Sequence, residues 1–423
     1  MSNKNINIKD TFFLSNAINK IDFKNKQVFL RVDLNVPIIN QDKNKAKAQK
    51  ILSDHKFLAI LPTIQMLLKK GAKIVVATHL SNPKKPDKSL STEILLPMFE
   101  KHGYKVSFEP DLDKAIQESA TIFKRHNILL LENLRFFKGE KNKKFAPEFA
   151  QKLTQLGDYY VNDAFGVLHR EDTSITLVPE LFGKQNIFLG LLVEHELHML
   201  EKLCAREHKK FTCIIGGGKV DTKLPLIQYV LDKVDKVLLC PAINFTFLKY
   251  AGKQVGNSLV DDSLLPLIPK ILRKAKNKKV KIVYPVDYIV AKDSFEGPIS
   301  IIDKNEIPDG FVGVSIGPKT TKKFTEIISN SKTVFFNGAP GNIKNIKTLQ
   351  GTMKMFKAMG KRGIFSVISG GDSVAIAYLT GAAQNIDYLS TGGGATLTFF
   401  SNQKLPGLAI FQSKDHQISQ KKG

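Results

Sequence analysis

The chain has 423 residues, which is too long for one ordinary hydrophobic core, so two domains are expected. Hydrophobic residues make up 43% of it and charged residues 24%, proportions typical of a water-soluble globular protein. No run reaches the roughly 18 apolar residues that span a bilayer, and the first residues lack the apolar segment of a signal peptide. We therefore expect a cytoplasmic protein without membrane contact.

The formal net charge of +24 has two interpretations. A basic chain can bind nucleic acid or phosphorylated metabolites. The excess consists of lysine, because the chain has only seven arginines, and the lysines are scattered in Asn/Lys-rich segments such as 41–50 and 274–281. This pattern favours a solvated surface. Nucleic-acid binding is not expected, since no nucleic-acid motif accompanies the charge.

To about residue 180, the chain alternates between strand and helix patterns. Apolar runs within 27–39, 73–83 and 127–137 indicate buried strands, whereas the amphipathic segments 56–72 and 145–157 indicate helices. Repeated alternation of this kind predicts an α/β fold with a doubly wound parallel sheet.

Polar residues follow successive strands of this sheet, namely Asp33, Asn35, His79, Arg135 and Arg170. Because ligands of α/β sheets bind at the carboxyl ends of the strands, we expect these side chains to meet at one edge. Arg31, Arg135 and Arg170 lie at or beside these ends, and the arginine fork suits a phosphate or carboxylate. A small anionic ligand is expected there. For Asp33 and Asn35 the alternative, an Asx turn without a ligand, stays open.

Residues 186–208 have the pattern of one long amphipathic helix, which is the best candidate for a linker between two domains. His195 and His198 lie on it without an HExxH pattern, so we interpret them as surface residues and not as metal ligands. The three cysteines also lack metal-binding spacing and are expected to be buried or free thiols in a reducing compartment.

A second α/β half begins with an apolar run that leads into Gly216–Gly218, Lys219 and Lys223. Glycines followed by lysine at a helix start are typical of a phosphate cradle. The spacing is not that of a Walker A motif, and the alternative is an ordinary strand-to-helix turn with two surface lysines. Further strands are expected within 236–241, 281–290, 332–341, 364–369 and 387–390.

Two more glycine turns lie within 365–400. Gly370, Gly371, Asp372 and Ser373 follow one apolar run, and Gly392–Gly394 follow the next. Each would aim free backbone N–H groups at an anion, and Asp372 can hold a Mg²⁺ that arrives with a polyphosphate. The alternative is that both are ordinary turns of an α/β fold.

The ordered motifs of the chain resemble those of the phosphoglycerate kinase family nearly from end to end. They include RVDLNVP, LLENLRF, YVNDAFG, GGGKVDTK, NGAPG, GGDS, STGGGAT and KLPG. The resemblance implies two Rossmann-like domains with doubly wound parallel sheets, joined by a long helix and a hinge. We expect an N-terminal triose-binding domain over 1–185, joined by the C-terminal segment 402–423. A nucleotide-binding domain is expected over 186–401, starting with the linker helix 186–208.

The resemblance also implies the reaction, a reversible phosphoryl transfer of glycolysis. 1,3-Bisphosphoglycerate and ADP would give 3-phosphoglycerate and ATP, with Mg²⁺ bound to the nucleotide and closure about a hinge. In the reverse direction the nucleophile is a carboxylate that is already ionised, so no general base is needed. Catalysis then consists of positioning and charge neutralisation. A monomer is expected, with these metabolites as its ligands.

Residue by residue, the resemblance assigns the triose to Asp33, Asn35, His79, Arg135 and Arg170. It assigns the nucleotide to Lys219, Lys223, Asn337, Gly370, Gly371, Asp372 and Ser373, with Asp372 as the metal ligand. Lys56, Lys219, Gly371 and Gly394 are implied at the transferring phosphoryl group.

Several positions depart from the family pattern. Lys56 stands where the family has a catalytic arginine, and Asn82 where it has a phosphate-binding arginine. Asp172 lies in a family segment that lacks acidic residues, and Cys240-Pro241-Ala242 replaces three glycines on the adenine side. Two hypotheses follow: a working kinase, with activity reduced by Lys56 and Asn82, or a catalytically silent relative kept as a binding or interaction protein.

Overall fold

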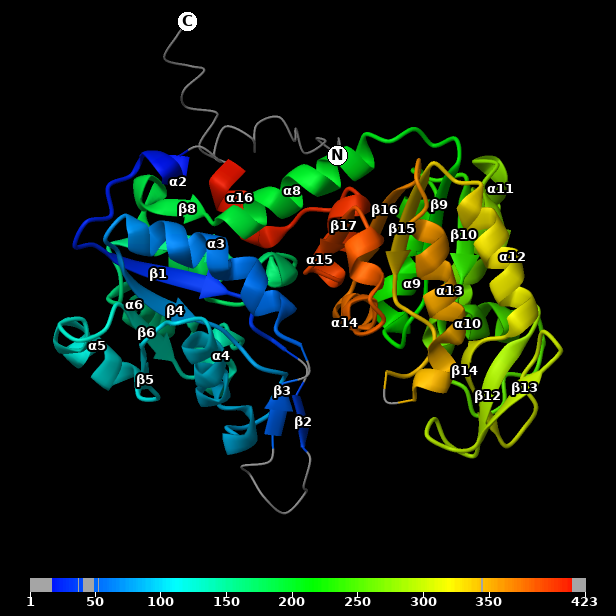
Figure 1. Ribbon diagram of the computed structural model, residues 1–423, viewed down its shortest axis with the longest axis horizontal. Coiled ribbons are helices and arrows are strands. Elements are labelled where there is room, and N and C mark those ends of the chain that lie inside the picture. The colour runs from blue at the N-terminus through cyan, green and yellow to red at the C-terminus, as the bar shows by residue number, and fades with distance from the viewer. Residues whose placement is uncertain (1–16, 37, 41–48, 52, 344, 413–423) are drawn as a thin grey trace, which may run out of the picture. The chain divides into compact units, whose positions relative to one another are not determined.

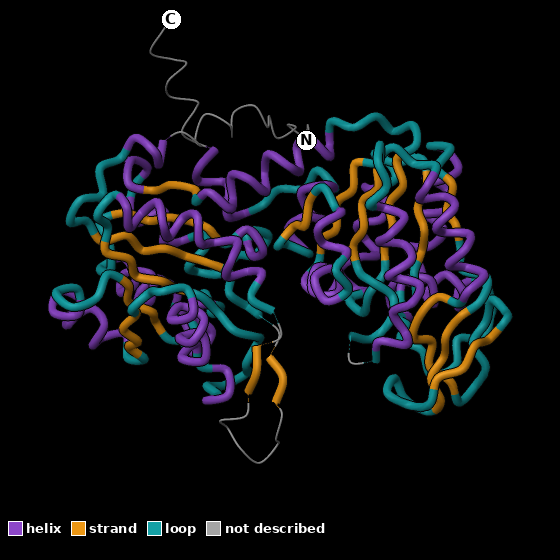
Figure 2. The backbone as a smooth tube through the Cα atoms, in the orientation of Figure 1, coloured by secondary structure: helices purple, strands orange, loops and turns teal. Residues whose placement is uncertain are grey.

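The computed structural model describes residues 17–412 except 37, 41–48, 52 and 344. Within these residues the chain divides into two compact units. The first comprises residues up to 198 together with those from 404 onward, and the second comprises 199–403. Both are α/β units with helices packed around a parallel sheet, as the sequence predicts (Figures 1 and 2).

The first unit is built on a six-stranded sheet in the order β5-β6-β4-β1-β7-β8, with every pairing parallel. Its strands are β1 (Gln27–Val32), β4 (Lys73–Ala77), β5 (Val106–Glu109), β6 (Ile128–Leu131), β7 (Tyr159–Asp163) and β8 (Ile187–Leu189). It also contains α2 (Ala17–Lys20), α3 (His55–Lys69), α4 (Leu96–Lys101), α5 (Leu112–Ile122), α6 (Ala146–Thr154), α7 (Leu177–Phe182), α16 (Pro406–Gln412) and the hairpin of β2 (Ile38–Asn40) with β3 (Gln49–Ile51).

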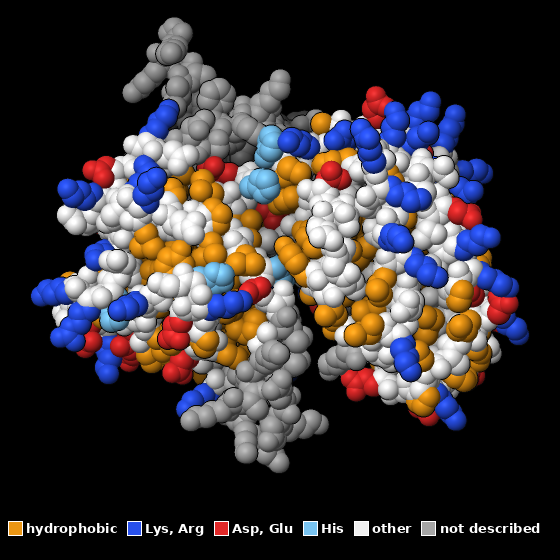
Figure 3. Space-filling view, in the orientation of Figure 1, with side chains coloured by type: hydrophobic (Ala, Val, Ile, Leu, Met, Phe, Trp, Pro, Cys, Tyr) orange, Lys and Arg blue, Asp and Glu red, His pale blue; other side chains and the backbone are white. Residues whose placement is uncertain are grey.

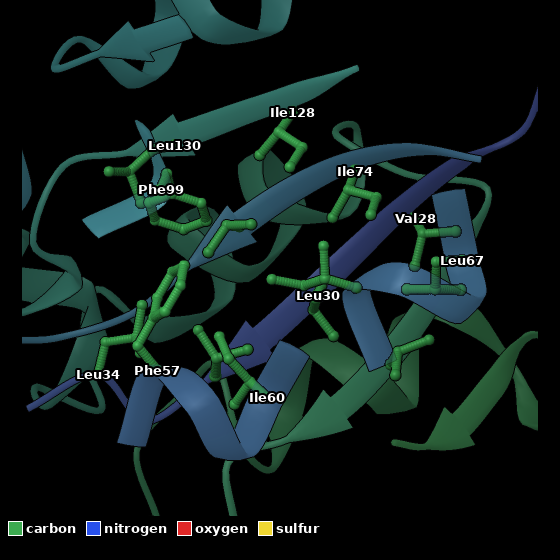
Figure 4. Packing of buried hydrophobic residues seen from close by; sticks show 14 of the residues in the cluster. Val28, Leu30, Leu34, Phe57, Ile60, Leu67, Ile74, Phe99, Ile128 and Leu130 are labelled. Atoms are coloured by element: carbon green, nitrogen blue, oxygen red, sulfur yellow. The ribbon is translucent and has the colours of Figure 1, made fainter. Parts of the chain in front are cut away.

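Alternate residues of the strands form two cores, one on each face of this sheet. Val28 and Leu30 of β1 pack with Phe57 and Ile60 of α3 on one face (Figure 4). Phe29, between them in sequence, points to the opposite face. There its ring lies 6.0 Å from that of Tyr160 and 6.4 Å from that of Phe182 in α7. Helices therefore cover both faces, which is the doubly wound arrangement.

The second unit contains another six-stranded parallel sheet, in the order β11-β10-β9-β15-β16-β17. Its strands are β9 (Phe211–Ile215), β10 (Lys236–Leu239), β11 (Lys281–Val283), β15 (Thr333–Asn337), β16 (Phe365–Ser369) and β17 (Tyr388–Ser390). Its helices are α9 (Val220–Val230), α10 (Ile243–Tyr250), α11 (Ile268–Asn277), α12 (Pro318–Ser329), α13 (Gln350–Met359), α14 (Gly371–Leu379) and α15 (Gly394–Phe400).

A three-stranded antiparallel sheet in this unit was not expected from the sequence. It consists of β12 (Tyr288–Lys292), β13 (Ile299–Ile302) and β14 (Phe311–Ile316). The single strand predicted over 281–290 is wrong, because the chain leaves the parallel sheet after β11 and enters the antiparallel one at β12. Pro285 lies between the two and has no N–H for a strand ladder.

The predicted helix 186–208 is shorter in the structure. Residues 187–189 form β8, and helix α8 runs only over Leu191–Cys204. Asp163 at the end of β7 determines this start, because its Oδ1 accepts the N–H groups of Leu192 at 3.0 Å and Val193 at 3.2 Å. The division between the units, after residue 198, falls inside α8. The domain boundaries predicted at 185 and 401 remain a proposal.

Glu194 in the first turn of α8 makes stability depend on pH. Its Oε1 is buried without a hydrogen-bond partner among the described residues. Burial, together with the nearby carboxyl of Asp163, raises the pKa of Glu194 to about 8. The folded state therefore holds a proton that the unfolded chain has released above about pH 4.5, so stability falls as the pH rises toward 8.

Replacing Glu194 by glutamine removes this titration. We expect Glu194→Gln to raise the thermal midpoint by about 3 °C at pH 8.5, as about 1 kcal/mol does in a domain of this size, and by less at pH 5. Differential scanning calorimetry at both pH values measures this, with Glu180→Gln on the exposed surface of α7 as the control. An equal gain at both values contradicts the assignment.

The C-terminal segment packs on the first unit. The N–H of Gly407 in α16 donates to the carbonyl of Leu168 at 2.9 Å. A side chain at Gly407 would lie 2.7 Å from Ile175 and from Leu168, so the contact is close. The part of the predicted C-terminal segment beyond residue 412 lies outside the described residues.

Lysine and arginine side chains are spread over the visible face of each unit in Figure 3. This agrees with the expectation of a solvated lysine-rich surface. In the described part of the chain, no helix combines the length and the apolar character needed to cross a membrane.

Candidate active site

Four adjacent strands of the first sheet bring the predicted triose residues together. Asp33 directly follows β1, and His79 lies two residues after β4. Arg135 lies in a short 3-10 turn after β6, and Arg170 lies beyond β7. Since β6, β4, β1 and β7 are neighbours with parallel register, these residues lie at one sheet edge, as predicted.

Asp33 and Lys56 form a nearly buried ion pair at this edge. The Nζ of Lys56 lies 2.7 Å from Oδ2 of Asp33, with side-chain exposures of 10% and 7%. Burial raises the pKa of Asp33, but the charge of Lys56 and the hydrogen bonds from Lys56 and Asn35 lower it further, so the net pKa is well below its usual range. Oδ1 accepts the N–H of Asn35 at 3.1 Å. The Asx turn left open by the sequence is therefore present within the site.

Asn35 connects this turn to the loop after β4. Its Oδ1 accepts the N–H of Ser81 at 2.8 Å. Ser81 has a positive φ of 54°, a conformation that non-glycine residues adopt rarely. The side chain of Asn35 therefore fixes the backbone beside Asn82.

His79 is buried and neutral. Burial and the charges of Arg31, Arg135 and Lys56 lower its pKa well below the usual value, and Asp33 only partly opposes them. Its Nδ1 lies 3.5 Å from Nη2 of Arg31. A guanidinium can only donate, so Nδ1 is the acceptor and Nε2 carries the proton. His79 can therefore donate a hydrogen bond through Nε2 but adds no charge.

Arg135 is held at the same edge by two groups. It donates through Nη1 to the carbonyl of Ser81, and its Nη2 lies 3.4 Å from Oδ2 of Asp172. Its Nε is buried without a partner among the described residues. Burial and the charge of Arg170 lower the pKa of Arg135, while Asp172 raises it. Asp172 thus orients Arg135 and offsets part of its charge.

Arg31 does not belong to the ligand-facing set in which the sequence placed it. It lies inside β1 with no exposed surface. Its Nε donates to Oγ of Ser174 at 2.7 Å, and Nη2 lies 3.8 Å from Oε1 of Glu140. Burial raises the pKa of Glu140 to about 7, although Arg31 and Ser174 oppose this. This network fixes Arg31, whose Nη2 lies 3.5 Å from Nδ1 of His79.

In the second unit, the side chain of Lys223 folds back onto the glycine turn that follows β9. The Nζ of Lys223 donates to the carbonyl of Gly216 at 2.6 Å. A side chain at Gly338 would lie 1.9 Å from that carbonyl and 2.5 Å from Nζ of Lys223, so only glycine fits. Burial and the charge of Lys219 lower the pKa of Lys223 to about 8, against the effect of Asp372. Lys219 precedes the first residue of α9.

Asn337 and Ser373 join the turns that follow β15 and β16. Oγ of Ser373 accepts the N–H groups of Gly338 at 3.2 Å and Ala339 at 3.0 Å. Nδ2 of Asn337 donates to Oγ of Ser369 at 2.6 Å. Its Oδ1 is buried without a partner in the described part of the chain, so it remains available to accept a hydrogen bond from a ligand.

Asp372 presents a carboxylate without a partner among the described residues, at the start of α14. It lies in the first turn of α14, whose cap Gly370 has a φ of 96°. Its exposed carboxylate makes no hydrogen bond or ion pair with a described residue, although it acts electrostatically on Lys223. Gly371 is also exposed, and a side chain there would meet nothing within 4 Å. No cluster of three or more potential metal ligands occurs among the described residues, so a bound Mg²⁺ needs ligands from elsewhere.

The two predicted glycine turns touch one another. A side chain at Gly393 would lie 3.0 Å from Cα of Gly370. The carbonyl of Gly393 also accepts Nδ2 of Asn337 at 3.3 Å, and Gly394 is the first residue of α15. Lys223, Gly338, Gly370, Asp372 and Gly393 are therefore grouped through these contacts at the carboxyl ends of the adjacent strands β9, β15, β16 and β17.

Ala242 has a strained backbone at the start of α10. It caps α10 with φ 69° and ψ −63°, a γ-turn conformation that is rare for any residue with a Cβ. We expect Ala242→Gly to raise the free energy of unfolding by about 1 kcal/mol because glycine adopts this conformation without strain. Urea denaturation measures the change.

Ala251 provides the matched control, since it caps the other end of α10 at φ −79°. Ala251→Gly relieves no strain and is expected to lower stability by about 0.5 kcal/mol. If the two variants change stability equally, Ala242 is not strained.

A model of the phosphoglycerate kinase family matches residues 18–403. The chain belongs to the phosphoglycerate kinase family. It is 38% identical to the cytosolic phosphoglycerate kinase of Triticum aestivum, over 93% of this chain and 96% of the relative. It is 37% identical to the phosphoglycerate kinase of Chlamydia muridarum, over 93% and 98% of the two chains.

Solved structures agree with this family. A structure of phosphoglycerate kinase from Pyrococcus horikoshii covers 96% of this chain and 99% of its own, with a TM-score of 0.76 and 29% identity. One from Coxiella burnetii covers 94% of this chain and 98% of its own, with a TM-score of 0.70 and 28% identity. The family and the α/β fold predicted from the motifs are therefore confirmed.

Three residues near the sheet edge that holds Asp33 and Arg135 were not predicted from the sequence. Glu140 and Ser174 support Arg31 from loops far away in the chain, and Lys141 donates to Oδ1 of Asn82. Spacing could not reveal them because the contacts span 34 to 143 residues of sequence. The segment KGEK did contain two of them, but a charged run is usually a solvated surface.

Proposed function

We propose that the protein is a phosphoglycerate kinase that transfers a phosphoryl group reversibly between 1,3-bisphosphoglycerate with ADP and 3-phosphoglycerate with ATP. The observation that supports this most is that the chain has residues suited to each of the two substrates, one set in each unit. The first unit holds a cationic sheet edge with Asp33, His79 and Arg135, and the second holds a glycine and lysine cradle with a free aspartate.

On the triose side, each residue has a distinct role in this proposal. Arg135 and Arg170 supply positive charge for the phosphate and carboxylate of the triose. His79 donates a neutral hydrogen bond through Nε2, and Asp33 and Asn35 accept from the hydroxyl group. Lys56 lies within 2.7 Å of Asp33 and supplies charge where the family has arginine.

On the nucleotide side, Lys219 and Lys223 neutralise the phosphate charge. Gly370 and Gly371 let phosphate oxygens approach the start of α14, and Ser373 fixes the loop after β15. The free carboxylate of Asp372 would hold a Mg²⁺ ion that arrives with the nucleotide phosphates. When bound with the nucleotide, Mg²⁺ supplies charge neutralisation on the phosphates.

The chemical step needs no general base in the direction of ATP consumption, because the accepting carboxylate is ionised. Lys56, Lys219 and the backbone N–H groups at Gly371 and Gly394 stabilise the charge on the transferring group in this proposal. The two ligands must also meet, and we propose that closure about a hinge brings them together and excludes water. The protein acts as a monomer in the cytoplasm in this account.

The alternative is a catalytically silent relative that binds ligands without turnover. The reason to consider it is that Lys56 and Asn82 stand where the family has arginines. The retained Asp372, Lys219 and Lys223 favour activity, since a chain released from catalysis loses such residues as readily as arginine.

A coupled assay of the purified protein with Mg-ATP and 3-phosphoglycerate tests this proposal. Turnover that requires both substrates and Mg²⁺ is expected. A folded protein that is thermally stabilised by the two ligands but produces no ADP supports the silent relative instead. A protein that neither turns over nor responds to 3-phosphoglycerate contradicts both.

A further inference from the structure

Lys141 lies next to Asn82 and contacts its side chain. Asn82 is the position at which the resemblance to the family implies a phosphate-binding arginine. The Nζ of Lys141 donates to Oδ1 of Asn82 across 59 residues of sequence. Lysine can only donate, so the amide oxygen must face it and the Nδ2 group points elsewhere. That Nδ2 group makes no hydrogen bond with any described residue. The ammonium group of Lys141 and the free amide NH₂ group of Asn82 are therefore neighbouring hydrogen-bond donors.

The loop that presents Lys141 is fixed on both sides. Residues 138–140 form a 3-10 turn in which a side chain at Gly139 would lie 2.2 Å from Phe149. Thr173 donates its N–H to the carbonyl of Glu140 at 2.8 Å and its hydroxyl to that of Gly139 at 2.6 Å. The side chain of Glu140 is fully buried against Ser174. Lys141 thus extends from an anchored backbone.

The charges around Lys141 are those of the triose edge. Partial burial and the guanidinium groups of Arg135 and Arg170 lower the pKa of Lys141, while Asp172 and Glu140 oppose them. Asp172 is engaged by Arg135 at 3.4 Å and orients it. Three cations therefore act on this region, whereas its two nearby carboxylates are both buried and paired, Asp172 with Arg135 and Glu140 with Arg31. This excess of positive charge favours a dianion.

We propose that Lys141 and Asn82 together replace the missing arginine and bind the phosphate ester of the triose. The ammonium provides the charge, and Nδ2 of Asn82 provides a second donor at a fixed angle. A guanidinium combines both properties in one side chain, whereas here they come from two loops. The inference rests on the proposed function, because it assigns new residues to the triose site of that reaction.

Steady-state kinetics of Lys141→Met tests the proposal. We expect the KM for 3-phosphoglycerate to rise about 10- to 100-fold, the effect of losing a charged hydrogen bond, with kcat within about threefold and the KM for Mg-ATP unchanged. Lys141→Arg should stay within about fivefold of wild type, since it keeps the charge. Adding Asn82→Arg to Lys141→Met should recover at least about tenfold of the loss.

Lys143→Met is the matched control from the same loop. Lys143 pairs with Glu171 at 3.4 Å on the exposed surface, so its removal should leave both KM values unchanged. An active wild type with an unaffected Lys141→Met variant overturns the role of Lys141 and leaves the proposed function intact. A loss confined to kcat, or no recovery with Asn82→Arg, also overturns it. A wild type that neither turns over nor is stabilised by 3-phosphoglycerate overturns the proposed function, and this inference with it.

Discussion

Replacing Asp372 by asparagine is expected to lower kcat about 100- to 1,000-fold. The substitution keeps the size of the side chain but removes the free carboxylate charge at the start of α14. The apparent affinity for Mg²⁺ at a fixed ATP concentration should fall, because the metal loses its one protein ligand in this account. The KM for 3-phosphoglycerate should stay unchanged. Initial rates over a titration of Mg²⁺ measure these effects.

Glu326→Ala provides the control for Asp372. Glu326 is an exposed acidic residue on α12 of the same unit, so it reports the effect of removing one surface charge. If Asp372→Asn and Glu326→Ala have the same small effect on kcat, Asp372 does not hold the metal.

Replacing Lys56 by methionine is expected to lower the free energy of unfolding by about 3 kcal/mol, because it leaves the carboxylate of Asp33 nearly buried and unpaired. In the wild type, Lys56 and its neighbours hold the pKa of Asp33 below its ordinary value. That stabilisation is present above about pH 4 and is lost as the pH falls below it. Chemical denaturation at pH 7 measures the loss, and kcat should fall as well, since a charge near the reacting group is gone.

The exposed pair of Lys101 with Asp54 is a matched control, because its N–O distance of 3.0 Å is similar but its side chains are 67% and 37% exposed. Lys101→Met should cost about 0.5 kcal/mol or less. Adding Asp33→Asn to Lys56→Met should restore much of the lost stability, since no buried charge then remains unpaired. Additive losses contradict the ion pair.

Lys56→Arg tests the departure from the family directly. Arginine restores the planar fork at this position and is expected to raise kcat about tenfold. An unchanged kcat means that lysine at this position does not limit the rate.

The sequence predicted that the polar residues after successive strands of the first sheet would meet at one edge, for a definite physical reason. Parallel strands place their carboxyl ends at one side, so Asp33, His79 and Arg135 had to be neighbours once β1, β4 and β6 paired. The same reason explains the grouping of Lys223 with Asp372 in the second unit. In that unit the local glycine and lysine patterns were sufficient to predict which residues meet, because each turn directly follows its strand.

Other features depend on contacts that no local pattern encodes. Arg31 was expected to face a ligand, but Glu140 and Ser174 bury it from loops more than 100 residues away. Its position in an apolar strand was compatible with either outcome. Similarly, the helix predicted from residue 186 begins only at Leu191, because Asp163 caps it from β7. Tertiary hydrogen bonds determined both results.

We propose that this chain performs phosphoryl transfer although it has Lys56 and Asn82 at these two positions. Phosphorus NMR of the purified wild-type protein with Mg-ATP and 3-phosphoglycerate observes the transfer without coupling enzymes. Signals of ADP and of an acyl phosphate should grow together, and removing Mg²⁺ should stop both. Unchanged ATP in a sample whose folded protein binds both ligands would contradict the account.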